Sequence, residues 1–359
     1  MTLNIFNPEH DLALASALDN FTAPHAGRQL RHDLAWTAAL WTHGDDDTEE
    51  CAVLVDDTAA AHRAAARRKM AGCRFVDKHT VKALNIDRVE TWGWDAAIRS
   101  QLIKLGIGSH AMPTAAQIEA IRQLSHRRTA AMLLTKLQGD GTVGEARECS
   151  TAEEATAAAA SYGRAVIKAP WSSSGRGVRF VDATADDGSI KARNDEGWLR
   201  NTIRQQGSVM VEPLYNKTID LAMEFYSDGR GTVTYSGLSL FHTQNGAYTG
   251  NIIATEHSKR RMISRYPAAQ YIDAVCERIC LLTGPLFNRR YAGPFGIDMM
   301  IVEGGALLHP CVELNLRRTM GHVALALLPR LNQQSDDDLR HIMRIDYEDN
   351  QYKLRIKRL

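Results

Sequence analysis

The sequence lacks the features that mark several common classes of protein. No window of about 18 apolar residues occurs, so no membrane partner or membrane-spanning helix is expected. The opening stretch MTLNIFNPEHD turns polar after six residues, so no secretory signal is expected. Neither sign of charge dominates, because the chain contains 43 Lys and Arg residues and 42 Asp and Glu residues, which gives a formal net charge of +1. This balance argues against a nucleic-acid partner.

Cysteine is scarce, and no CxxC pair occurs among the six residues present. In a chain of 359 residues this scatter predicts reduced thiols and a cytoplasmic protein. Cys276 and Cys280 have the four-residue spacing of a metal-binding helix face, but they continue an apolar helical stripe, which favours core packing.

Two nucleotide-binding fingerprints are also missing, namely G-x-G-x-x-G and the P-loop G-x-x-x-x-G-K-[ST]. What is present is a 44% apolar chain, enough for sizeable cores. Short apolar strands alternate with helices at the start, which predicts a Rossmann-like parallel layer. Alternating stretches at 220–226 and 232–241 predict antiparallel strands. The sequence also predicts one long helix from Thr114, capped by Gln117, to about Gln138, and a fraying end at 353–358.

The stretch AVIKAPWSSSGRGV combines a strand that ends in Lys168 with a loop of very small side chains. Such a loop can approach a polyphosphate closely, because glycine supplies the required dihedral angles and backbone N–H groups donate to phosphate oxygens. Lys168 would neutralise the α or β phosphate, and Arg176 would add a donor fork. The alternative is a hairpin turn that is rich in Ser and Gly.

A second set of residues offers hard oxygen ligands. Glu313 and Asn315 lie two apart on one strand face, and Asp298 is on the preceding strand of the same predicted hairpin. Two carboxylates and an amide oxygen suit Mg²⁺, which completes its shell with water and phosphate. Arg317, two residues further on, would stabilise negative charge on a transferred group. The alternative, a salt-bridged surface hairpin, conflicts with the apolar residues between these positions.

A third element, VMVEPL at 209–214, is an apolar strand that ends in an acid and a break. Backbone groups at its edge, near Glu212 and Leu214, could read an adenine base, and Asp220 could reach the ribose. A plain sheet strand is an equal alternative.

In their order along the chain, the three elements resemble the ATP-grasp superfamily, and the resemblance runs from about Thr114 to Leu331. The resemblance implies an N-terminal Rossmann-like (pre-ATP-grasp) domain at 1–113, a lid-side subdomain at 114–208 and a C-terminal subdomain with the metal site at 209–359. It also implies a cytoplasmic enzyme that binds ATP and one or two Mg²⁺, with Mn²⁺ as a possible substitute.

The resemblance assigns three sets of site residues. The catalytic set is Arg317, Lys168 and Arg176. The nucleotide-binding set is Lys168, Ser172, Ser173, Ser174, Gly175, Gly177, Glu212, Leu214, Asp220 and Arg128. The metal ligands are Asp298, Glu313 and Asn315. Many members of the superfamily carry a lysine where this sequence offers Arg127 and Arg128, so the register there stays open.

The implied reaction is ATP-dependent ligation: a carboxylate becomes an acylphosphate, and an amine then captures it. The substrates would be small-molecule or peptide carboxylates and amines, while the oligomeric state stays unknown. A phosphotransferase or a catalytically silent ATP-binding module is the alternative.

Substrate recognition must use other parts of the chain. The cluster Asn7-Pro8-Glu9-His10-Asp11 follows the first strand, where ligands bind in open α/β sheets, although Asn7 or Asp11 could instead cap a helix. The stretch 241–254 fits a substrate loop or a hairpin equally well. The basic runs at 67–69, 259–261 and 353–358 are expected to be solvated.

Overall fold

The first part of the chain is a parallel α/β layer. The computed structural model describes residues 1–359 except 42–49, 69–71, 173–176, 183–192, 245–246 and 332–338. Four parallel strands stand in the order β3 (Cys73–Val76), β2 (Cys51–Leu54), β1 (Thr2–Ile5) and β4 (Arg88–Thr91). The helices of this domain are α1 (His10–Ser16), α2 (His25–Leu34), α3 (Thr58–Ala66) and α4 (Ala96–Lys104). The predicted Rossmann-like layer is confirmed.

The cysteine prediction fails within this layer. Cys51 and Cys73 stand opposite each other on the neighbouring strands β2 and β3, and they form a disulfide. Parallel strands bring directly opposed side chains close together on one face of a sheet, and no local sequence pattern reveals that pairing. Cys149, Cys276, Cys280 and Cys311 remain free.

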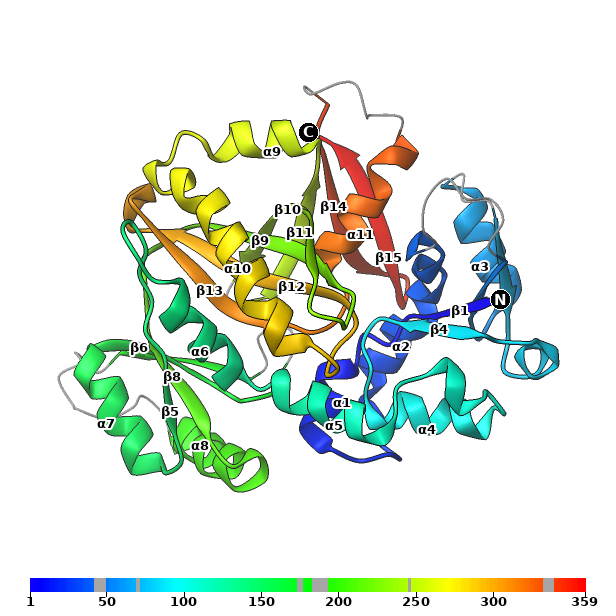
Figure 1. Ribbon diagram of the computed structural model, residues 1–359, viewed down its shortest axis with the longest axis horizontal. Helices are drawn as coiled ribbons and strands as arrows, with labels where there is room; N and C mark the ends of the chain where they lie inside the picture. The colour runs from blue at the N-terminus through cyan, green and yellow to red at the C-terminus, as the bar shows by residue number, and fades with distance from the viewer. Residues whose placement is uncertain (42–49, 69–71, 173–176, 183–192, 245–246, 332–338) are drawn as a thin grey trace.

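A small antiparallel sheet forms the lid-side subdomain, drawn at the lower left of Figure 1. Its strand order is β5 (Arg147–Cys149), β8 (Val209–Pro213), β6 (Arg164–Lys168) and β7 (Val178–Asp182). Two helices, α7 (Ala152–Tyr162) and α8 (Arg193–Gln206), pack with it. Strand β8 pairs with β5 and β6, so the boundary that the sequence placed at 208/209 cuts through this sheet.

A seven-stranded antiparallel sheet forms the centre of the molecule (Figure 1). Its order is β13 (Leu307–Asn315), β12 (Gly293–Val302), β9 (Lys217–Ser227), β10 (Val233–Gln244), β11 (Ala247–Ile253), β14 (His341–Glu348) and β15 (Gln351–Arg358). The predicted antiparallel strands at 220–226 and 232–241 are confirmed as β9 and β10. Residues 353–358 were expected to be a fraying end. They belong instead to the edge strand β15, which pairs with β14 along its whole length.

Period-two alternation gives this sheet one dry face and one polar face. Leu221, Met223 and Phe225 of β9 are fully buried in the main core. Helices α5 (Ala115–Leu124), α6 (Arg127–Leu137) and α10 (Ile272–Phe287) cover that face. Asp220 and Glu224 alternate with these residues and therefore point to the opposite face. The packed core on one face of β9 thereby fixes the positions of the acidic side chains on its other face.

The helix that the sequence predicted from 114 to 138 is two helices. Thr114 and Gln117 form the expected capping box of α5, which ends at Leu124. The side chain of His126 then accepts from the backbone N–H of Arg128, at 3.0 Å, and caps α6. The other α-helices of the described residues are α9 (Glu256–Ile263) and α11 (Met320–Leu327).

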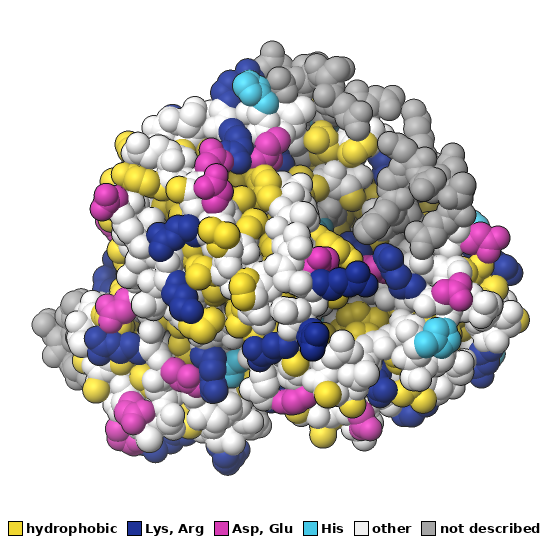
Figure 2. All heavy atoms as spheres, in the orientation of Figure 1, with side chains coloured by type: hydrophobic (Ala, Val, Ile, Leu, Met, Phe, Trp, Pro, Cys, Tyr) yellow, Lys and Arg dark blue, Asp and Glu magenta, His cyan; other side chains and the backbone are white. Residues whose placement is uncertain are grey.

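Charged groups of both signs are spread over the face shown in Figure 2, with apolar groups between them, as the near-zero net charge implies. Within the described segments, no helix combines the length and apolarity needed to cross a membrane.

Candidate active site

The predicted carboxylate pair lies at the β12–β13 hairpin. Asp298 stands directly opposite Glu313 in the ladder, and Gly296 stands opposite Asn315. Asn315 donates its Nδ2–H to Asp298 Oδ2 at 3.2 Å. Removal from water, and then the nearby Glu313 and Glu224 carboxylates, raise the pKa of Asp298 to about 8.

This donor set fits a divalent cation. The two carboxylates repel each other, and a cation between them relieves that repulsion. In the described residues no group of three or more His, Cys, Asp or Glu side chains is arranged to hold a metal ion, and the predicted set has only two such side chains. Asp298, Glu313 and Asn315 are the candidate ligands that the sequence offers for Mg²⁺, whose shell water and phosphate would complete.

Arg127 links this hairpin to the lid-side subdomain. Its guanidinium lies 2.9 Å from Glu313 Oε1, donates from Nε to the Ala169 carbonyl at 3.0 Å and reaches Ser172 Oγ at 3.3 Å. The side chain is only 8% exposed. Arg128, which the sequence analysis assigned to the nucleotide, is 54% exposed and binds Glu148 at 2.7 Å. The structure therefore places Arg127, and not Arg128, beside the candidate metal ligands.

Lys168 stands at the end of β6 with a buried ammonium group. Its Nζ lies 2.5 Å from Glu212 Oε2 on the neighbouring strand β8. Lys168 also contributes to lowering the pKa of His309 on β13, where burial is the larger cause. The charge of Lys168 therefore acts on a residue of β13, the strand that also carries Glu313.

The loop after Lys168 is closed at its base. Ala169 donates its N–H to the Gly177 carbonyl at 2.8 Å. A Cβ on Gly177 would lie 2.3 Å from that of Ser172, so this close approach requires glycine. The other predicted loop residues, Ser173, Ser174, Gly175 and Arg176, lie outside the described residues.

The predicted adenine and ribose residues have protein partners here. Glu212 pairs with Lys168, as described above, and Leu214 donates its N–H to the Arg164 carbonyl at 2.9 Å. Asp220 Oδ2 accepts from Lys217 Nζ at 2.6 Å and from Thr243 Oγ1 at 2.7 Å. None of these contacts decides whether residues 209–214 read an adenine base or form a plain sheet strand.

Arg317, which follows β13, joins the central sheet to the N-terminal domain. Its guanidinium binds the Asp11 carboxylate through Nε at 3.0 Å and through a terminal nitrogen at 2.8 Å. Burial acts to raise the pKa of Asp11, but the attraction of Arg317 and then of His10 outweighs it and lowers that pKa. This bidentate ion pair connects the predicted N-terminal cluster with Arg317.

The rest of the cluster is also tightly held. Asn7 donates to the Gly93 carbonyl at 2.8 Å, and His10 Nδ1 lies 3.3 Å from Asp95 Oδ2. A Cβ on Gly93 would lie 2.6 Å from the His10 ring, so the two segments pack this closely only with glycine. Neither Asn7 nor Asp11 caps α1, whose N-cap is Glu9 without a side-chain bond, so the capping alternative is wrong.

Beside this cluster the protein has a pocket of about 340 Å³. Asn7, Glu9 and Arg31 line it together with Asp95. Arg31 binds Glu9 Oε1 at 2.9 Å, while Glu9 Oε2 has no hydrogen-bond partner among the described residues. The pocket therefore presents both signs of charge to a small ligand.

The sequence analysis did not identify Glu224 as a buried carboxylate. The residue is fully buried on the polar face of β9. Its carboxylate lies 3.0 Å from His322 Nδ1, but that nitrogen already accepts the backbone N–H of Thr319 at 3.1 Å. In the described part of the chain no group donates to either oxygen of Glu224. The four-residue spacing from Asp220 within an alternating strand was the available signal.

The stretch 241–254 agrees with the hairpin alternative, whereas Lys259 differs from expectation. Residues 241–254 lie mainly in the β10–β11 strands, where Asn251 is buried and donates to Ser239 Oγ at 2.7 Å. Lys259, expected to be solvated, is 2% exposed, and its Nζ donates to the Leu238 carbonyl. Burial is the main cause that lowers the pKa of Lys259.

The fold of this chain is similar to those of two solved structures. The structure resembles N5-carboxyaminoimidazole synthetase from Staphylococcus aureus complexed with ADP, with a TM-score of 0.51 at 14% identity over 97% of this chain and 83% of that one. It also resembles biotin carboxylase from Campylobacter jejuni in a βγ-ATP complex, with a TM-score of 0.52 at 12% identity over 98% and 77%. No protein-family model and no curated protein sequence matches the chain.

Two buried histidines make the stability of this protein sensitive to acid. Burial lowers the pKa of His126 to about 4 and that of His309 to about 3. Because an unfolded histidine titrates near 6.5, the folded state binds fewer protons below that pH and loses stability as the pH falls towards 4. Between pH 6.5 and 5.0 each histidine should cost about 2 kcal/mol of unfolding free energy.

Urea unfolding at several pH values measures this loss. The variant His309→Gln removes one titrating group and should flatten the dependence, while replacing the half-exposed His32 by Gln should leave it unchanged. An unfolding free energy that stays constant from pH 7.5 to 5.0 would contradict the burial argument.

Proposed function

We propose that this protein is an ATP-dependent ligase that activates a carboxylate as an acylphosphate and joins it to an amine. The observation that carries the proposal is the connection through Arg127, which contacts both Glu313 and the loop that follows Lys168. In this proposal the cation-binding hairpin and the glycine-bordered loop after Lys168 form one site. That combination suits a magnesium nucleotide whose terminal phosphate is transferred.

Each side chain has a distinct role in this proposal. Lys168 contacts the α and β phosphates, and Ser172 and Gly177 frame the loop over the β and γ phosphates. Arg317 stabilises negative charge on the transferred group. Bound Mg²⁺, held by Asp298, Glu313 and Asn315, supplies charge neutralisation. The carboxylate attacks the γ phosphorus, the bond to the β–γ bridging oxygen breaks, and ADP leaves; the amine then displaces phosphate.

The pocket at the N-terminal cluster is the proposed substrate site. Glu9 and Arg31 line it with opposite charges, and Asp11 connects the cluster directly to Arg317. A small molecule that carries both an amine and a carboxylate matches this lining.

Hydroxylamine trapping tests the activation step without knowledge of the natural amine. Candidate carboxylates, incubated with the protein, ATP, Mg²⁺ and hydroxylamine, should give a hydroxamate and stoichiometric ADP and phosphate. A stable phosphorylated product without free phosphate would favour the phosphotransferase alternative. ATP binding without any turnover over a broad set of amino acids and peptides would favour the silent binding module.

A further inference from the structure

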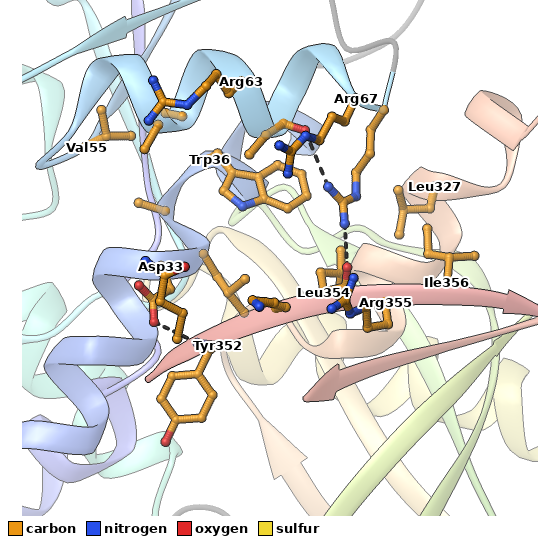
Figure 3. A pocket seen from close by; sticks show the side chains of 18 of the residues that line it. Asp33, Trp36, Val55, Arg63, Arg67, Leu327, Tyr352, Leu354, Arg355 and Ile356 are labelled. Carbon is orange, nitrogen blue, oxygen red and sulfur yellow. Dashed lines mark hydrogen bonds between the residues drawn. The ribbon is translucent and has the colours of Figure 1, made fainter. Parts of the chain in front are cut away.

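Two basic segments that lie far apart in the sequence meet at one place in the fold. Arg63, Arg67 and Arg68 belong to the last turn of α3 and the residues that follow it, while Arg355 and Arg358 lie on β15. Figure 3 shows Arg63 and Arg67 projecting from α3 opposite Arg355 of the strand. The sequence analysis expected both segments to be solvated independently. Their convergence is a property of the tertiary structure alone.

Between them is a pocket of about 980 Å³ at the junction of the N-terminal domain with α11 and the β14–β15 hairpin. In the described part of its lining, seven Arg and Lys side chains face two carboxylates. Since the net charge of the whole chain is only +1, this excess is local. Trp36, Val55, Leu327 and Ile356 supply apolar wall between the charged groups.

The two carboxylates of the lining are engaged with backbone groups. Asp57 accepts the N–H of Ala60 at 2.8 Å and caps α3. Asp33 accepts the N–H of Tyr352 at 2.7 Å, as the dashed line in Figure 3 shows. Both acids therefore use hydrogen-bonding capacity to fix the walls of the pocket.

Among the described residues the cations of the lining are only partly compensated, because Arg355 pairs with Glu348 at 2.5 Å and Lys353 with Asp349 at 2.6 Å. Arg68 donates to the carbonyls of Ala64 and Leu354 and lies over the Trp36 ring at 4.5 Å. No carboxylate among the described residues pairs with Arg68. Burial, followed by repulsion from Arg355 and Arg67, lowers its pKa. Burial also lowers the pKa of Arg330 at the other side of the pocket. A bound anion would relieve this repulsion between like charges.

We propose that this pocket binds a small organic anion with two or more negative charges, carried by phosphate or carboxylate groups. The planar donor forks of arginine match both groups. The apolar wall accommodates a carbon skeleton, which inorganic phosphate lacks. A small ligand fits better than a nucleic acid, because the cations line a concavity of limited volume and the face of Trp36 is already covered by Arg68.

Titration calorimetry on the full chain, without Mg²⁺ or nucleotide, tests the proposal with two probes. Propane-1,3-diyl bisphosphate represents the phosphate class, and propane-1,2,3-tricarboxylate represents the carboxylate class. At least one should bind saturably at one site per chain, and the stronger probe identifies the class. The variants Arg63→Gln/Arg67→Gln and Arg355→Gln/Arg358→Gln remove exposed cations from opposite walls, and each should weaken binding at least about tenfold.

Two controls separate this pocket from other sites. Arg164→Gln/Arg204→Gln removes the same charge from exposed positions on the lid-side subdomain and should leave the affinity unchanged. Lys168→Met should also leave it unchanged, since Lys168 belongs to the proposed nucleotide site. Failure of both probes to bind the wild type overturns the proposal. So does binding that survives both pocket variants and disappears in Lys168→Met, a result that would instead support the nucleotide site.

Discussion

Replacement of Glu313 by glutamine should lower magnesium-dependent ATP turnover by at least about a thousandfold. Glutamine keeps the shape of the side chain and can still accept from Arg127, but it removes one of the two negative charges that face each other across β12 and β13. The fold should persist, because Arg127 retains its bonds to Ala169 and Ser172. The loss would therefore report on cation binding rather than on stability.

Two measurements check this expectation. ADP release gives turnover, and calorimetry with ATP in the presence and absence of Mg²⁺ gives the part of the affinity that depends on the metal. In Glu313→Gln that difference should largely disappear. Glu277→Gln, an exposed position on α10, is the matched control and should behave as the wild type. Retention of full magnesium dependence in Glu313→Gln would remove the metal role from this hairpin.

The β12–β13 hairpin was predictable because its pattern is local. Phe295, Ile297 and Met299 are fully buried and alternate with Gly296, Asp298 and Met300, and this period of two fixes which face of β12 carries Asp298. A short connection then sets the register with β13 and brings Glu313 opposite. The same alternation was present in β14 and β15, where Met343 and Leu354 point into the core. The charged residues between them concealed it.

The residues that complete the site depend on information that the local sequence does not contain. A helix turns about 100° per residue, so the choice between Arg127 and Arg128 depended on where α6 begins. His126 sets that start by capping the helix, and it directs Arg127 inward. The pairing of Arg317 with Asp11 joins positions 306 residues apart. Only the packing of the N-terminal domain against the central sheet determines such contacts.

Substitution of Lys168 by methionine should weaken ATP binding by about one to two orders of magnitude, the value of a charge-assisted contact with phosphate. Methionine keeps much of the apolar stem and removes the ammonium group. It also leaves the Glu212 carboxylate buried without its partner at 2.5 Å. That loss should cost about 3–5 kcal/mol of unfolding free energy, as it does when one member of a buried ion pair is removed.

A second substitution separates these two effects. In Lys168→Met/Glu212→Gln no unpaired charge is left, so most of the stability should return, whereas the affinity for ATP should stay low because the cation is still missing. Lys136→Met, at an exposed position of α6, controls for the general effect of the replacement. Urea unfolding and nucleotide titration on the wild type, Lys168→Met, Glu212→Gln and the double variant complete the cycle, with Lys136→Met measured beside them. If the double variant recovered ATP affinity together with stability, Lys168 would serve only as the partner of Glu212, and the phosphate-binding role would have to be assigned to Arg127 and the neighbouring loop.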